Sequence, residues 1–324
     1  MPFIRELVVI LSLFFVGSAK ARSIQHPTRD GLYTNRPIIG ILAHDIDDDI
    51  IKKYGKSFIP ASYVKYLESA GARVVPIRDN LTSDELKSLF LKINGVLFPG
   101  GDSDLWKSGY ARTGAAIFDL AMEANDNGDV FPLWGTCLGF QLLHVRAAKG
   151  KDVLTKCSGE NVSLPLNFTD GYKDSRMFRN AHNDVTQDMA KLGVTLNMHV
   201  NCVTVETYEK ESSLSSFFKK LSTNMDKDDK VKFVSTVEGL KYPFYGTQWH
   251  PEKNQFEWTY EENINHSSEA VKVAQYVANF FVDQARLSKH RFSSREEESA
   301  ALIYNYQPIK CFPDVTHYEQ CYFF

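Results

Sequence analysis

The stretch that best fits catalytic chemistry is residues 130–141, which read Val-Phe-Pro-Leu-Trp-Gly-Thr-Cys-Leu-Gly-Phe-Gln. An apolar, strand-like run ends at Gly135, and a helix is expected to follow as far as about Ala148, so the chain turns sharply at Cys137. Glycines two residues before and after the cysteine, Gly135 and Gly139, remove side chains that would collide in so tight a turn, as in a nucleophile elbow. The dipole and free N–H groups of a helix N-terminus favour a thiolate there. We therefore predict that Cys137 is a nucleophile, and a buried structural cysteine after a core strand is the alternative.

A cysteine nucleophile needs a base, and the base needs a group that orients it. Among the nine histidines, His250 is the best placed, because it follows a strand expected over residues 245–249 and precedes Glu252 by two positions. Pro251 stiffens the link between them, so the carboxylate can fold back onto the imidazole, select its tautomer and favour the imidazolium. A loop histidine beside a solvated glutamate is the alternative interpretation.

Together these residue types indicate acyl transfer, in which the thiolate attacks a carbonyl, His250 protonates the leaving amine, and water hydrolyses a thioester. The tetrahedral oxyanion then needs backbone N–H donors. We expect one donor to be Leu138, the first helical residue, and the other to be Gly100 or Gly101, where the missing Cβ lets backbone approach a substrate. A simple turn after a strand is the other interpretation of the two glycines.

The first half of the chain alternates strand-like apolar runs with amphipathic helical stretches. The expected strands are Pro37–Leu42, Arg73–Ile77, Gly95–Phe98 and the run into Gly135. The expected helices cover residues 63–70, residues from Thr82 or Ser83 to about Lys92, and residues 117–124. This alternation predicts βαβ units and a mostly parallel sheet. Because chemistry gathers at the carboxyl ends of strands in such sheets, Gly100, Gly101 and Cys137 are expected on one edge.

The second half has a weaker pattern. Residues 151–230 are expected to form antiparallel hairpins and loops that wall the site, with a strand candidate at Val203–Thr207 and a helix candidate at Leu214–Leu221. Further strands are expected at Lys232–Glu238 and Tyr245–Trp249, and a long amphipathic helix is expected from Ala270 to Phe281.

The composition is that of an ordinary globular protein, with 324 residues, 43% of them hydrophobic, and a net charge of −3. The absence of a basic excess argues against nucleic acid as the main partner. No CxxC pair or His/Cys cluster with zinc spacing is present, so neither a metal nor another cofactor is expected. Four cysteines besides Cys137 remain for disulfides in three possible connectivities: Cys157, Cys202, Cys311 and Cys321.

The N-terminus has the pattern of a targeting segment. Arg5 precedes an apolar stretch, Leu7–Val16, and small residues follow, so residues 1–21 are predicted to be a cleaved signal peptide. An uncleaved anchor or a buried helix is the alternative, although the apolar stretch is short for a bilayer. Four glycosylation sequons agree with a secretory route, at Asn80, Asn161, Asn167 and Asn265.

Three motifs together resemble those of the class I glutamine amidotransferase-like superfamily: residues 135–141, Pro99-Gly100-Gly101 and residues 248–252. Within it the chain resembles the γ-glutamyl hydrolases (folate polyglutamate hydrolases, peptidase family C26). That closer resemblance lies in residues 175–178, 235–239, 242–253 and 301–304, and it extends from about Pro37 to the C-terminus.

The resemblance implies a flavodoxin-like, three-layer α/β/α sandwich with a mostly parallel central sheet. It implies a catalytic domain over residues 30–290 and a C-terminal extension, residues 291–324, that packs on the domain. It also implies Cys137 as nucleophile, His250 as general base and then acid, and Glu252 as the orienting carboxylate.

The implied reaction is cleavage of γ-linked glutamates from folyl- or antifolyl-polyglutamates by a homodimer in the lysosome or outside the cell, with no membrane or nucleic acid partner. His199 is matched to a histidine that helps hold the substrate glutamate, and Gln141 is expected beside the substrate. Two positions depart from the mammalian pattern, since Asn201 stands where an aromatic residue is expected and Gln141 where glutamate is expected.

Two other functions stay open at this point. Glutamine at position 141 is found in glutaminase domains, which predicts a cytosolic chain with a synthetase partner. The departures at positions 141 and 201 also allow a secreted paralogue that binds γ-glutamyl compounds without cutting them.

Overall fold

A computed structural model describes residues 34–46, 51–311, 313 and 315–324. The predicted signal peptide, residues 1–21, lies outside the described residues. Within the described ranges, no helix combines the length and the apolar character needed to span a bilayer.

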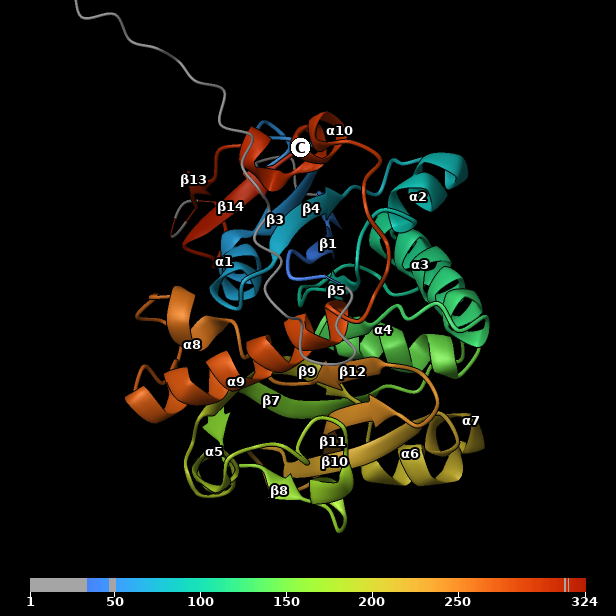
Figure 1. The fold of residues 1–324 in the computed structure, drawn as a ribbon. Coiled ribbons are helices and arrows are strands. Elements are labelled where there is room, and N and C mark those ends of the chain that lie inside the picture. The colour runs from blue at the N-terminus through green and yellow to red at the C-terminus, as the bar shows by residue number, and fades with distance from the viewer. Residues whose placement is uncertain (1–33, 47–50, 312, 314) are drawn as a thin grey trace, which may run out of the picture.

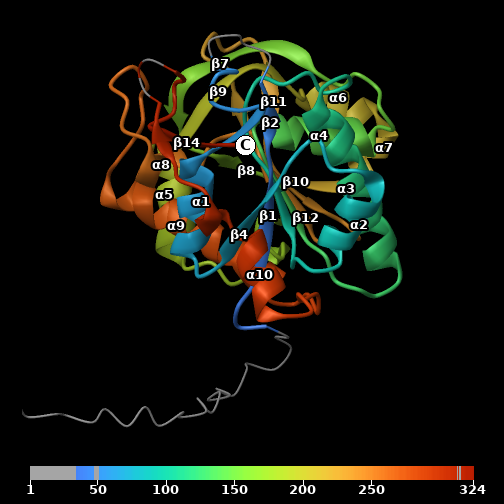
Figure 2. The same cartoon turned by 90° about the horizontal axis from the view of Figure 1, so that it is seen from above.

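The centre of the protein is an eight-stranded sheet with helices on both of its faces (Figures 1 and 2). Its order is β4 (Arg73–Ile77), β1 (Ile38–Leu42), β5 (Val96–Phe98), β6 (Leu133–Thr136), β12 (Phe244–Thr247), β11 (Lys232–Gly239), β10 (Phe218–Met225) and β8 (Asn167–Phe168). The first five strands pair in parallel and the last three in antiparallel fashion. The predicted mostly parallel central sheet is confirmed.

Two hydrophobic cores separate the three layers. Helices α2 (Ser83–Phe90), α3 (Gly109–Asp126) and α4 (Leu138–Ala147) pack into one core, and α1 (Ala61–Ser69) and α9 (Ser268–Ala285) into the other. Strand β1 contributes to both, because Ile38 and Leu42 face the first core while Ile39 and Ile41 face the second. Burial on both faces explains why this strand is a continuous apolar run, and the α/β/α sandwich is confirmed.

The C-terminal residues pair with a segment near the start of the domain. A four-stranded sheet has the order β13 (Ile309–Lys310), β14 (Gln320–Phe323), β3 (Ser57–Pro60) and β2 (His44–Asp45). Cys321 and Tyr322 lie opposite Pro60 and Ile59 in antiparallel register. This pairing brings Tyr318 close to the carboxyl end of β5, where its hydroxyl lies 3.4 Å from the Gly100 carbonyl oxygen.

Residues 151–230 contain the expected antiparallel pairing, in which β7 (Thr155–Leu164) pairs with β9 (Thr195–Cys202). A disulfide between Cys157 and Cys202 joins these two strands, with their Cα atoms 6.2 Å apart. Cys137, Cys311 and Cys321 are free thiols. The remaining elements are α5 (Asn183–Lys191), α6 (Val205–Lys210), α7 (Ser212–Ser215), α8 (Lys253–Phe256), α10 (Arg295–Ala301) and the short 3-10 helices η1 (Tyr172–Asp174) and η2 (Ile303–Asn305).

Two local predictions in this region are wrong. The strand expected at Val203–Thr207 is instead the start of α6, because the Thr204 side chain accepts a hydrogen bond from the Thr207 N–H at 2.9 Å and caps the helix. The helix expected at Leu214–Leu221 ends as α7 at Ser215. Strand β10 then begins at Phe218, where pairing with β11 outweighs local helical spacing.

Candidate active site

Cys137 sits at the turn between β6 and α4 in a strained conformation. Its φ of 50° and ψ of −102° lie outside the regions that non-glycine residues favour. Its N–H donates to the Thr247 carbonyl at 2.8 Å, which holds the turn against β12. A Cβ at Gly135 would collide with the backbone of Gly139, and a Cβ at Gly139 with the backbone of Phe98. Backbone-to-backbone packing on both sides of the turn therefore requires the two glycines that flank the cysteine.

His250 and Glu252 form a buried pair just after β12. His250 Nδ1 donates to Glu252 Oε1 at 2.7 Å, and the glutamate is wholly buried. Burial lowers the pKa of His250, but the negative charges of Glu252 and Cys137 outweigh it and raise the pKa to about 10. The imidazole is therefore held as an imidazolium at neutral pH, with its proton on Nδ1 directed at the carboxylate.

The Cys137 side chain acts on the same imidazole through both its charge and a side-chain hydrogen bond, and both raise the His250 pKa. Gly100 lies against both the ring and the thiol, since a Cβ built there would be 2.6 Å from His250 Cε1 and 3.1 Å from Cys137 Cβ. The Cys137 sulfur also lies 3.6 Å from Gln248 Nε2 and 3.7 Å from the Met198 carbonyl. Cys137 and His250, from distant parts of the sequence, thus meet at one glycine, and Glu252 is held to the site through His250.

The backbone donors predicted for an oxyanion lie at the same place. Leu138 is the first residue of α4, so its N–H has no acceptor within the helix. The N–H of Gly100 donates to the Tyr63 hydroxyl at 2.8 Å, and that hydroxyl lies 3.4 Å from His250 Nδ1. Tyr63 is a site residue that the sequence does not reveal, because its spacing in α1 indicates only one position on a buried helical face.

The two residues expected beside the substrate are both buried and bonded within the protein. His199 Nε2 lies 3.1 Å from Asn197 Oδ1, and its Nδ1 lies 3.5 Å from the Cys157 sulfur. Burial and the nearby His250 charge lower the pKa of His199 to about 3, so this imidazole is neutral.

Gln141 is a link between α4 and β9. Its Nε2 donates to the Asn201 carbonyl at 2.8 Å and approaches Gln248 Oε1 at 3.3 Å. Gln248 is the residue whose amide contacts the Cys137 sulfur. The two positions that depart from the mammalian pattern, 141 and 201, are therefore in direct contact.

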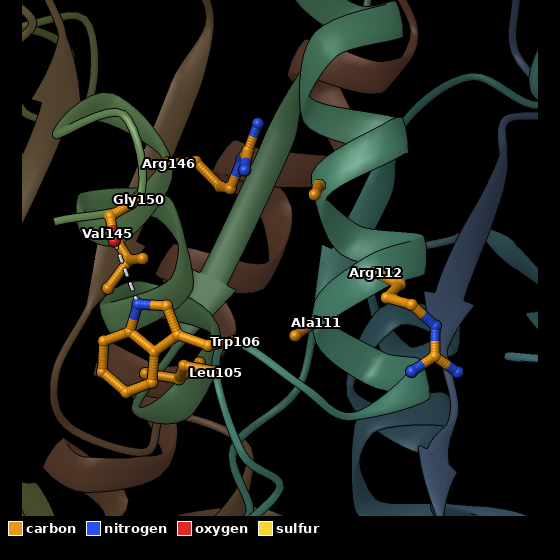
Figure 3. A pocket seen from close by; sticks show the side chains of 8 residues that line it. Leu105, Trp106, Ala111, Arg112, Val145, Arg146 and Gly150 are labelled. Carbon is orange, nitrogen blue, oxygen red and sulfur yellow. Dashed lines mark hydrogen bonds between the residues drawn. The ribbon is translucent and has the colours of Figure 1, made fainter. Parts of the chain in front are cut away.

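A separate cavity of about 350 Å³ lies between α3 and the end of α4 (Figure 3), and Cys137 is not among the residues that line it. The Trp106 indole N–H donates to the Gly150 carbonyl at 3.1 Å on one wall. The side chains of Arg112 and Arg146 line the cavity but point in different directions (Figure 3). Within the described ranges, no group of three or more His, Cys, Asp or Glu side chains is arranged to hold a metal ion.

The fold is similar to that of a solved glutaminase domain. The glutaminase domain of Trypanosoma brucei CTPS superposes with a TM-score of 0.51 over 79% of this chain and 98% of that chain, at 13% identity. At this identity the likeness concerns the fold alone.

The chain belongs to the peptidase C26 family, whose sequence model matches residues 37–252. It is 44% identical to the γ-glutamyl hydrolase of Homo sapiens over 318 residues, which cover 98% of both chains. It is 45% identical to the γ-glutamyl hydrolase of Bos taurus over 289 residues, covering 89% of this chain and 90% of the relative.

Proposed function

We propose that this protein hydrolyses the γ-glutamyl amide bonds of folyl- and antifolyl-poly-γ-glutamates through a thioester on Cys137. The observation that carries the proposal is the buried His250–Glu252 pair at 2.7 Å, set beside a cysteine on a strained turn at a helix N-terminus. Full-length similarity to enzymes named γ-glutamyl hydrolase supports the substrate class.

In the first half of the reaction, the Cys137 thiolate attacks the γ-carbonyl carbon of the substrate. The carbonyl oxygen becomes an oxyanion, and we assign its stabilisation to the N–H groups of Leu138 and Gly101. Gly101 is preferred to Gly100 because the Gly100 N–H already donates to Tyr63. The His250 imidazolium then gives its Nε2 proton to the departing amine as the C–N bond breaks.

In the second half of the reaction, His250 must act as a base, so its pKa has to fall. The loss of the negative charge on Cys137 causes that fall. Burial lowers the pKa of His250, and the charges of Glu252 and Cys137 raise it; once the sulfur is acylated the thiolate contribution is gone, so the pKa falls. The neutral Nε2, which has just lost its proton, accepts one from water as the water attacks the thioester. The products are a γ-carboxylate and the restored thiolate–imidazolium pair.

The cellular setting follows from the sequence. The proposed signal peptide and the four sequons support a glycoprotein that acts in the lysosome or outside the cell. We also propose a homodimer as the assembled form, on the resemblance to the γ-glutamyl hydrolases.

The experiment is incubation of the purified protein with pteroyl-penta-γ-glutamate at acid and neutral pH, with products separated by chromatography. Release of glutamate or short γ-glutamyl peptides is expected. Hydrolysis of free glutamine alone would point to a glutaminase, and binding without products would point to a non-catalytic paralogue.

Cys137→Ala tests the nucleophile directly. We expect it to retain the fold and substrate binding but to lose turnover, by at least about 10³-fold. Cys311→Ala, which removes another buried free thiol, is the matched control and keeps its activity. Retained turnover in Cys137→Ala would reject the thioester mechanism.

A further inference from the structure

The peptide group between Gly100 and Gly101 is held by residues from separate parts of the chain. His44 Nε2 lies 3.0 Å from the Gly100 carbonyl oxygen, and the Tyr318 hydroxyl lies 3.4 Å from the same oxygen. On the other side of Gly100, its N–H donates to the Tyr63 hydroxyl. Two side chains contact the Gly100 carbonyl oxygen and a third contacts the Gly100 N–H, which indicates that the orientation of this backbone is important.

His44 has the surroundings needed to act as a fixed donor. It lies in β2, is almost wholly buried, and stacks on Tyr110 with ring centroids 4.7 Å apart. Because a carbonyl oxygen only accepts, Nε2 carries the proton, and Nδ1 accepts from the Ser103 hydroxyl at 3.0 Å. Burial lowers the pKa of His44 to about 4, so the ring stays neutral and keeps this tautomer at neutral pH.

The orientation of the Gly100 carbonyl sets that of the next N–H. In a planar trans peptide, the C=O of one residue and the N–H of the following residue point in opposite directions. When His44 draws the Gly100 carbonyl to itself, the Gly101 N–H is turned the other way. The imidazole also fills the space that a side chain at Gly101 would need, so the ring packs directly on this peptide.

We propose that His44 is a positioning residue, which holds the Gly100 carbonyl so that the Gly101 N–H faces the oxyanion formed at Cys137. This inference rests on the proposed thioester reaction. Tyr318 reinforces the same orientation from the C-terminal segment, which is anchored by pairing of β14 with β3. The contact acts when negative charge develops on the substrate oxygen, and it has no part in forming the thiolate or in binding the ground state.

The test compares His44→Leu, which removes the donor, with His44→Gln, whose side-chain amide replaces Nε2–H. For pteroyl-penta-γ-glutamate we expect His44→Leu to lower kcat by about tenfold with KM changed less than about twofold, because an oxyanion donor is misplaced. His44→Gln should recover most of that loss. The rate at which iodoacetamide alkylates Cys137, followed by mass spectrometry of its peptide, should be unchanged in both, because alkylation forms no oxyanion.

His290→Leu is the matched control, since His290 also contacts a backbone carbonyl, that of Phe90 at 2.8 Å, but far from the site. It is expected to lower stability and leave kcat unchanged. If His44→Leu does not fold, Tyr318→Phe and Ser103→Ala test the same peptide with smaller changes, and a kcat reduction of about two- to threefold at constant KM supports the proposal.

The positioning role would be overturned if these variants kept the kcat of the unmutated protein. It would also be overturned if the rate of Cys137 alkylation fell in parallel with kcat. A wild-type protein that releases no glutamate would instead overturn the proposed function, so the two failures are distinguishable.

Discussion

Glu252 Oε1 lies 2.7 Å from His250 Nδ1, and both side chains are closed off from solvent. Burial lowers the pKa of His250, but the charges of Glu252 and Cys137 outweigh it, so the folded-state pKa is raised from 6.5 to about 10. A raised pKa means that this pair stabilises the fold fully below about pH 6.5 and that the contribution is lost as pH rises through about 10.

Glu252→Gln removes the charge while keeping the shape of the side chain. The His250 pKa should then fall by at least about one unit, since an opposite charge at this distance is worth one to three units. We expect the basic limb of the kcat/KM profile to move to lower pH and kcat to decrease. Measuring kcat/KM across a series of pH values checks this. Glu206→Gln is the control, because Glu206 forms an exposed ion pair with Lys210. A basic limb that stays in place would contradict the role of Glu252.

Gln141→Glu replaces a donor with an acceptor against the Asn201 carbonyl, 2.8 Å away. At neutral pH we expect a loss of about 1–3 kcal/mol in the free energy of unfolding, because a buried carboxylate would face a carbonyl oxygen. The pKa of the introduced carboxyl group would be raised in the folded state. The loss in the free energy of unfolding therefore grows as pH rises above the unfolded-state pKa of about 4.3. It shrinks at lower pH, where the protonated acid can donate a hydrogen bond.

Urea unfolding of this variant at pH 7.5 and pH 4.5 measures the difference. Gln141→Leu is the comparison, because it loses the hydrogen bond without gaining a charge and should show a similar deficit at both values. Equal deficits for Gln141→Glu at the two pH values would show that residue 141 faces solvent or substrate rather than Asn201.

The Cys157–Cys202 disulfide closes a sequence separation of 45 residues across β7 and β9. The double variant Cys157→Ser/Cys202→Ser should lose about 2–4 kcal/mol of stability, because the unfolded chain gains freedom. Non-reducing peptide mapping should recover the two cysteines in one cross-linked fragment. Cys311→Ser, which removes a free thiol, serves as control, and a map that links Cys157 to another cysteine would refute this pairing.

The four sequons differ in what surrounds their side-chain amides. Asn80 and Asn167 are exposed, whereas Asn161 Nδ2 donates to the Glu261 carbonyl at 3.0 Å and Asn265 Nδ2 to the Gly193 carbonyl at 2.7 Å. Because the glycan is attached to Nδ2, we expect high occupancy at Asn80 and Asn167 and low occupancy at the other two. Enzymatic deglycosylation in heavy-oxygen water with peptide mass spectrometry measures occupancy, and full occupancy at Asn265 would contradict the expectation.

Much of the framework was predictable because its signals are local. The glycines around Cys137, the apolar run of β1 and the His250-Pro251-Glu252 tripeptide all show their roles within a few residues. The parallel strands place such motifs on one edge, so a sequence that alternates strands and helices also indicates where they meet. The local predictions that failed, at Val203–Thr207 and Leu214–Leu221, were those in which a cap or strand pairing outweighed the side-chain pattern.

The sequence by itself therefore determined the α/β class with a mostly parallel sheet, the turn at Cys137 and the candidate acid–base pair, since strand, turn and helix signals act over short range. Only the tertiary structure decided what surrounds them. Gly100 meets His44, Tyr63 and Tyr318 across 56, 37 and 218 residues, and Gln141 meets Asn201 across 60. Such contacts depend on how distant elements pack and register, and no spacing within a single element encodes them.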